Sequence, residues 1–145
     1  MDCIFRKLTP DDIELALAMN TGFREGFFTA DSAAAFLADD HNWLLAAICN
    51  GAIIGFACGY ELLHHAGLRM LYIHEIGVAE AFQRQGVGTA LINALKDSCR
   101  EGGISRFFLF TARSNTAANA LYRKAGGETG WDSHGHDTVY FFQLS

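Results

Sequence analysis

The feature of this sequence that most restricts its fold is a glycine-containing turn. It lies between an apolar segment and a segment with helical periodicity. Residues 70–78 are almost entirely apolar, as in a strand of a central sheet. In residues 86–100 the apolar side chains recur every four positions, which predicts a helix. Gly86 and Gly88 lie at the start of this helix. Glycines let the main chain approach a ligand closely, and the first N–H groups of a helix lack partners within it. The turn is therefore predicted to bind a phosphate or pyrophosphate group.

Two known phosphate-binding motifs do not fit this turn. A P-loop requires a lysine directly after its last glycine, and no lysine follows the glycines here. The dinucleotide fingerprint requires three glycines, whereas residues 86–91 contain two. Both motifs are therefore disfavoured.

The other patterns along the chain predict strands and helices that belong to one mixed α/β domain, residues 1–145. Thr9-Pro10-Asp11-Asp12 is typical of a helix start, because a hydroxyl caps the helix, proline fits its first turn and acids favour its dipole. Asn50-Gly51 between two apolar runs predicts a two-residue hairpin. The expected strands cover residues 3–8, 43–49, 52–60, 70–78, 104–111 and 139–144, and the expected helices cover residues 10–22, 31–38, 86–100 and 115–124.

Two segments of the chain resemble signatures of the GNAT superfamily of N-acetyltransferases. The first signature, [QR]-x-x-G-x-[GA], is matched by Gln83, Gly86 and Gly88 in the expected strand–turn–helix setting. The second, N-x-x-A-x-x-L-Y-x-K-x-G, is matched from Asn115 to Gly126. The resemblance covers essentially the whole chain. It implies the GNAT fold, of the α/β (α+β) class, with a mixed central sheet of about six or seven strands flanked by about four helices.

The resemblance also implies that the turn and the strand before it bind acetyl-CoA as co-substrate. Main-chain amides of residues 85–89 would hold the pyrophosphate, and main-chain groups of Ile76 and Val78 would pair with the pantetheine arm. Asn115 would reach that arm from the other side, whereas Asn119 either does the same or faces solvent. The cofactor-binding residues expected on this basis are Ile76, Val78, Gln83, Arg84, Gln85, Gly86, Val87, Gly88, Thr89 and Asn115.

Glu75 and Tyr122 are the candidates for catalysis. Acetyl transfer needs a base for the amine, a donor to the carbonyl oxygen and a proton for the departing thiolate. Glu75 is the expected base or amine anchor, since a carboxylate within an apolar strand can have a raised pKa. Tyr122 matches the superfamily tyrosine that lies near the sulfur, and the Val78 N–H would polarise the carbonyl. His74 and Glu75 are adjacent in the strand, so their side chains should point to opposite faces.

A narrower resemblance concerns the aminoglycoside 3-N-acetyltransferases of type I. Residues 23–27, 72–78 and 84–96 are similar to that family. The acceptor implied is the 3-amino group of an aminoglycoside antibiotic, whose acetylation gives resistance. The chain departs from that family at Glu75 (usually aspartate), Gly88 (usually alanine) and Asn115 (usually an acid). A polyamine, another small amine or a protein N-terminus stays open as acceptor, and so does a non-catalytic acyl-CoA-binding module.

The charge of the chain is divided unevenly. Residues 1–80 carry 11 acidic and 4 basic side chains, a charge of −7, and residues 81–145 carry 5 and 7, a charge of +2. The acidic half suits a cationic small-molecule amine and disfavours nucleic acid, because phosphate binding needs a basic surface. Besides Glu75, the expected substrate-binding acids are Glu25, Asp31 and Asp137.

Composition and the N-terminal sequence indicate a folded cytoplasmic protein. Half of the residues are hydrophobic, which supports a packed core, yet no apolar run approaches the roughly 20 residues that span a bilayer. The first residues also lack the pattern of a signal peptide. The cysteines are scattered without a Cys-x-x-Cys pair and are expected to be reduced: Cys3, Cys49, Cys58 and Cys99.

The sequence predicts no metal site and leaves dimerisation open. The histidines, including His134 and His136, lack the spacing of zinc ligands, so no metal site is expected. Trp131 and residues 140–142 could supply the apolar surface of a homodimer, or could belong to the core.

Overall fold

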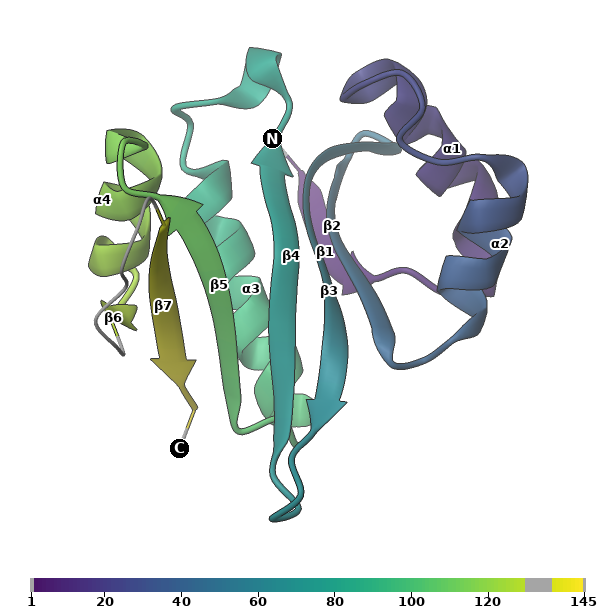
Figure 1. The fold of residues 1–145 in the computed structure, drawn as a ribbon. Coiled ribbons are helices and arrows are strands. Elements are labelled where there is room, and N and C mark those ends of the chain that lie inside the picture. The colour runs from purple at the N-terminus through teal and green to yellow at the C-terminus, as the bar shows by residue number, and fades with distance from the viewer. Residues whose placement is uncertain (1, 130–136, 145) are drawn as a thin grey trace.

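A mixed sheet in the strand order β1-β2-β3-β4-β5-β7-β6 forms the centre of the fold (Figure 1). The computed structural model describes residues 2–129 and 137–144. Along these residues the strands are β1 (Cys3–Lys7), β2 (Asn42–Cys49), β3 (Ala52–Leu63), β4 (Arg69–Val78), β5 (Arg106–Ala112), β6 (Glu128–Thr129) and β7 (Asp137–Gln143). The helices are α1 (Ile13–Gly22), α2 (Ala30–Ala38), α3 (Val87–Glu101) and α4 (Thr116–Lys124), with single 3-10 turns η1 (Pro10–Asp12) and η2 (Glu80–Phe82). The predicted fold class is confirmed.

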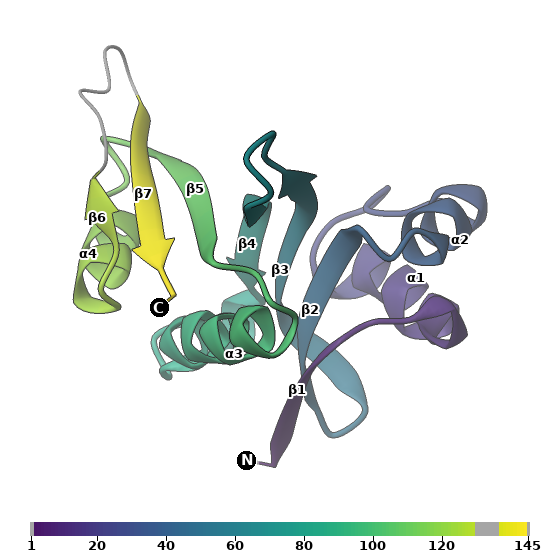
Figure 2. The same ribbon diagram turned by 90° about the horizontal axis from the view of Figure 1, so that it is seen from below.

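Helices cover both faces of the sheet. α1 and α2 lie on one face and α3 and α4 on the other (Figures 1 and 2). Leu44 and Leu45 are adjacent in β2 and both fully buried, because Leu44 packs with the α1–α2 cluster and Leu45 with the α3–α4 cluster. In the described part of the chain no helix is long and apolar enough to cross a membrane.

The predicted apolar surface at residues 140–142 is largely core. Tyr140 is completely buried and Phe142 nearly so, both packing with the α3–α4 cluster. Phe141, between them, is half-buried on the other face of β7. Trp131 lies outside the described residues. Of the three aromatic residues 140–142, two are therefore buried in the core and cannot belong to a dimer surface.

β4 and β5 run parallel and then part. They pair from Met70 with Arg106 to Ile73 with Leu109. Beyond that point β4 pairs only with β3, up to Val78, and β5 pairs only with β7, within the described residues. The two strands therefore diverge towards their carboxyl ends, as Figure 1 shows. This divergence opens the sheet where the predicted site residues lie.

A β-bulge in β4 lies beside the point of divergence. Cys58 is opposite Glu75 and Gly59 is opposite Ile73, so His74 is the extra residue. Gly59 makes the bulge possible, because a Cβ at this position would collide with the Tyr72 carbonyl. The bulge interrupts the alternation of side chains. His74 contacts the rings of Tyr60 and Tyr72, and Glu75 reaches Arg24 on the same face. The prediction that His74 and Glu75 face opposite sides is therefore wrong.

Two of the helices begin at capping side chains. Thr29 caps α2 and accepts a hydrogen bond from the Ser32 N–H at 3.0 Å. Asn115 is the N-cap of α4 rather than its first residue, and its Oδ1 accepts from the Ala118 N–H at 3.1 Å. The strand predicted from residue 104 begins only at Arg106, since Ile104 turns into the core instead.

A disulfide joins β1 to β2. Cys3 and Cys49 are directly opposite each other in the antiparallel pair, with their Cα atoms 4.2 Å apart. Cys58 and Cys99 are free and buried. The prediction that all four cysteines are reduced is therefore wrong for this pair. Sequence spacing could not reveal it, because 46 residues separate the partners and only strand pairing brings them together.

We expect loss of this disulfide to lower the free energy of unfolding by about 2–4 kcal/mol, because the cross-link restricts the unfolded chain. Urea unfolding of Cys3→Ser should show this difference from the wild type under oxidising conditions. In the presence of dithiothreitol the two proteins should unfold at similar urea concentrations. Equal stability without dithiothreitol would contradict the expectation.

Candidate active site

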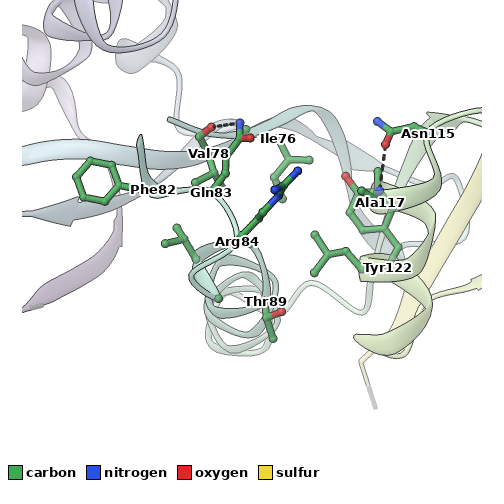
Figure 3. Close-up of a pocket in the computed structure, with 15 residues that line it drawn as sticks. Ile76, Val78, Phe82, Gln83, Arg84, Thr89, Asn115, Ala117 and Tyr122 are labelled. Carbon is green, nitrogen blue, oxygen red and sulfur yellow. Dashed lines mark hydrogen bonds between the residues drawn. The ribbon is translucent and has the colours of Figure 1, made fainter. Parts of the chain in front are cut away.

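A cavity of about 580 Å³ opens where β4 parts from β5, between the start of α3 and the helix α4 (Figure 3). Its lining contains most of the residues that the sequence predicts. The predicted residues are Ile76, Val78, Gln83, Arg84, Gly86, Val87, Gly88, Thr89, Asn115 and Tyr122. The lining residues that sequence reasoning missed are Gly77, Phe82, Ala117, Ala118 and Leu121. Gln85 and Glu75 do not line it. These residues are small or apolar neighbours of the two motifs. Only their spacing relative to the motif residues could have indicated that they line the cavity.

The first turn of α3 presents free N–H groups to this cavity. α3 has no side-chain cap, in contrast to α2 and α4, and its first N–H with a protein acceptor among the described residues is that of Ala90, which donates to the Gly86 carbonyl. Gly86 is the N-cap and has φ +83°. No heavy atom lies within 4 Å of the position where its Cβ would be. The open N–H groups and the helix dipole favour an anion here.

Arg84 adds positive charge to the same end of the cavity. Its φ of +64° is in the left-handed region, which is uncommon for a residue with a side chain. Figure 3 shows this side chain extending from the turn into the space between α3 and α4. A strained backbone at such a position is typical of ligand-binding turns.

The two glycines of the motif have different physical roles. Gly86 provides the left-handed turn, whereas a Cβ on Gly88 would approach Leu121 Cδ2 of α4 to 3.1 Å. Gly88 therefore allows α3 and α4 to pack closely. Gly88 also lines the cavity, so the prediction that both glycines let a ligand approach stays a prediction, and the packing role of Gly88 is an addition to it.

The glutamines of the motif hold the turn together. Gln83 Nε2 donates to the Val78 carbonyl at 3.0 Å, which ties the turn to the end of β4 (Figure 3). Gln85 Nε2 donates to the Ala81 carbonyl at 3.2 Å. Both side chains are thus engaged in the turn itself.

Tyr122 lies on the α4 side of the cavity. The side chain is largely buried, and burial raises the pKa of its hydroxyl to about 12. The phenol therefore keeps its proton at neutral pH. Its ring packs 5.5 Å from the ring of Tyr140, which fixes it against the core.

Asn119 neither lines the cavity nor faces solvent. It is buried, and its Nδ2 donates to the carbonyls of Ala112 and Asn115 at 3.0 and 2.7 Å. The Tyr140 hydroxyl donates to its Oδ1 at 2.7 Å. Asn119 thus connects α4 to β5 and β7, and the alternative in which it faces solvent is wrong. Two of its partners come from other elements, so the helix sequence alone gave no sign of them.

Glu75 lies on the opposite face of the sheet and is ion-paired. Arg24, from the segment between α1 and α2, donates to Glu75 Oε2 and Oε1 at 2.5 and 2.9 Å. The hydrogen bonds from Arg24 lower the pKa of Glu75, outweighing the burial that would raise it. The predicted increase in the pKa of Glu75 is therefore wrong. The sequence could not show the contact with Arg24, which is 51 residues away along the chain.

The other predicted substrate-binding acids are exposed and lie in three different parts of the fold. Glu25 follows Arg24 in the loop, Asp31 lies in the first turn of α2 and Asp137 begins β7; all three are exposed. None of them lines the cavity. Among the described residues no group of three or more His, Cys, Asp or Glu side chains could hold a metal ion, and His134 and His136 lie outside those residues.

Comparison with known proteins identifies the family. Residues 13–127 match the model of the Acetyltransferase (GNAT) family. The N-alpha-acetyltransferase RimI of Mycobacterium tuberculosis is 36% identical over 90 residues, which cover 62% of this chain and 54%, about half, of that relative. The chain spans one third of the length of another curated relative.

Solved structures share the fold. The aminoglycoside acetyltransferase HMB0005, from an uncultured soil metagenomic sample, is 27% identical with a TM-score of 0.76, covering 93% of this chain and 97% of that one. The aminoglycoside acetyltransferase meta-AAC0020, also from a soil metagenomic sample and in complex with sisomicin, is 20% identical with a TM-score of 0.78, covering 92% and 93%. The family match extends over most of the sequence, and the chain belongs to the Acetyltransferase (GNAT) family.

Proposed function

We propose that this chain transfers an acetyl group from acetyl-CoA to a primary amine. One observation carries the proposal: the opening between β4 and β5 brings an uncapped helix N-terminus and a neutral tyrosine into a single cavity. Members of this family use acetyl-CoA, which supplies an activated acetyl thioester when bound. The free N–H groups of the turn, the open space at Gly86 and the cation of Arg84 fit the pyrophosphate of such a ligand.

Four parts of the cavity have separate roles in this proposal. The N–H groups of residues 86–89 and the Arg84 side chain would hold the pyrophosphate. The unpaired side of β4 at Ile76–Val78 would hold the pantetheine arm by main-chain hydrogen bonds. Tyr122 would donate a hydrogen bond to the sulfur as negative charge develops on it. Asn115 Oδ1 is already used in capping α4, so its Nδ2 is the group left to contact the ligand.

The acceptor would approach from the face that carries α1 and α2. Glu75 lies there, next to the opening, and four aromatic residues (Tyr60, Tyr72, Phe108 and Phe110) form what we call the aromatic floor. Tyr72 connects them, with ring centroids 6.5, 5.4 and 6.1 Å from those of Tyr60, Phe108 and Phe110. Phe110 is 54% exposed. Aromatic faces attract ammonium groups and provide apolar contact area, so the floor suits a cationic ligand with a flat apolar surface.

We propose an aminoglycoside as this acceptor, acetylated at its 3-amino group. The similarity to the aminoglycoside acetyltransferase HMB0005 over nearly the full length of both chains supports this choice. So do the cation-binding features on the acceptor face, Glu75 and the aromatic floor. Glu25, Asp31 and Asp137 would contribute only through the negative charge of the surface, since they are exposed and none of them lines the cavity. A protein N-terminus is the second candidate, because of the 36% identity to the N-alpha-acetyltransferase RimI.

A thiol-release assay with acetyl-CoA distinguishes these acceptors. The panel contains gentamicin, sisomicin, spermidine and short peptides with a free N-terminal alanine. We expect turnover on gentamicin or sisomicin, with the 3-amino group identified as the acetylated position by NMR. Turnover on the peptides alone would reject the aminoglycoside proposal, and no turnover on any amine would reject acetyl transfer itself.

Gly86→Glu should weaken acetyl-CoA binding by about tenfold or more, because a carboxylate would enter the anion site. Isothermal titration calorimetry measures this directly. Gly51→Glu is the matched control, since Gly51 also has a positive φ, +78°, and open space around its Cβ position, but lies in the β2–β3 turn. Equal affinity of the two variants for acetyl-CoA would contradict the site.

Tyr122→Phe should lower kcat by about 10²-fold while acetyl-CoA affinity stays unchanged, because only the proton donor is lost. Tyr140→Phe is the control: it removes a buried hydroxyl that donates to Asn119, which should cost about 1 kcal/mol of stability and leave kcat near that of the wild type. Because the pKa of Tyr122 is about 12, its hydroxyl stays protonated below about pH 11. The wild-type rate should therefore show no decrease from ionisation of Tyr122 in that pH range. A kcat of Tyr122→Phe equal to that of the wild type would contradict the role of Tyr122 as proton donor.

A further inference from the structure

The ion pair between Arg24 and Glu75 joins the segment between α1 and α2 to β4, one residue before Ile76, which lines the cavity. The guanidinium Nη1 and Nη2 donate to both carboxylate oxygens at 2.5 and 2.9 Å. Both partners are partly exposed, Arg24 by 55% and Glu75 by 32% of their side-chain surface. The pair is therefore open to competition from a cation in solution.

Packing holds Arg24 in this position. Its guanidinium lies 4.4 Å from the centre of the Phe27 ring, a cation–π contact. Phe23 and Phe27 in turn pack edge-on against Phe56 of β3, at 4.9 and 5.1 Å between ring centroids. The segment between α1 and α2 is thus anchored to the sheet, and the arginine is directed at the carboxylate.

The surroundings of Glu75 offer it no other strong partner among the described residues. The titratable groups that face it are Arg24 from the α1–α2 segment, Cys58 from β3 and His74 from its own strand. Burial raises the pKa of the Cys58 thiol to about 12, so it stays neutral. The guanidinium uses one lone pair on each carboxylate oxygen and balances the charge of Glu75, so a second cation is attracted only weakly while Arg24 stays in place.

We infer that Arg24 occupies the place on Glu75 that an acceptor ammonium group must take, so that the acceptor binds by displacing it. This inference rests on the proposed function, because it assigns Glu75 to the acceptor side of the opening. It makes Arg24 a residue that determines specificity. A simple monoamine would compete poorly with a bidentate guanidinium, whereas a polycationic acceptor that also contacts the aromatic floor can replace it.

The consequence is unusual for an active-site arginine: its removal should tighten binding of the acceptor. Gentamicin is the probe, and its dissociation constant is measured by calorimetry, without turnover. Arg24→Gln should bind gentamicin roughly three- to tenfold more tightly than the wild type, the range of a partly exposed ion pair. Glu75→Gln should bind it more weakly, and Arg24→Lys, which keeps a cation but loses the bidentate pair, should lie between the wild type and Arg24→Gln.

A change in net charge alone could also favour a cationic ligand. Arg100→Gln controls for this, because Arg100 is exposed in α3, pairs with Asp97 and lies on the other face of the sheet. It should leave gentamicin affinity unchanged. A dissociation constant in Arg24→Gln that is equal to or higher than that of the wild type would overturn the inference, as would equal tightening in Arg100→Gln.

A second readout does not involve the acceptor. The carboxyl carbon of Glu75, followed by NMR through a pH titration, should report a higher pKa in Arg24→Gln than in the wild type, because the guanidinium that lowers it is gone. An unchanged pKa would mean that the pair does not form in solution. Because neither readout uses turnover, an absence of acetyl transfer would reject the proposed function without deciding this inference.

Discussion

The parting of β4 from β5 beyond Ile73 and Leu109 is the constraint on which the rest of the structure depends. Parallel strands that stayed paired to their ends would bury their main-chain groups against each other. Here the end of β4 has one free side, and the cavity lies against it. In the proposed reaction, groups on the two faces of the sheet meet where the strands diverge.

Separate parts of the core hold the two sides of this opening. On the α3–α4 side, the close approach of Gly88 to Leu121 sets the distance between the helices, and Asn119 connects α4 to β5 and β7. On the α1–α2 side, Phe23 and Phe27 fix the segment that carries Arg24. The bulge at His74 turns Glu75 towards that segment. The two sides are positioned by different packing contacts, which suits a reaction with two substrates.

The features that sequence predicts well are local ones. The turn at Gly86, the four-residue repeat of α3 and the Thr9 cap depend on neighbouring residues, so the sequence pattern is enough to predict them. The bulge, the Cys3–Cys49 disulfide and the Arg24–Glu75 pair depend on strand register or on residues 46 to 51 positions apart. The pKa of Glu75 was wrongly predicted for this reason, since burial in a strand was visible in the sequence and the opposing guanidinium was not.

The central claim is that the cavity beside β4 binds acetyl-CoA with its sulfur at the opening in the sheet. A crystal structure of the complex with coenzyme A tests it most directly. The account predicts the pyrophosphate at the N–H groups of Val87, Gly88 and Thr89, and the thiol next to the Tyr122 hydroxyl. A pyrophosphate bound away from the start of α3, or a thiol distant from Tyr122, would contradict it.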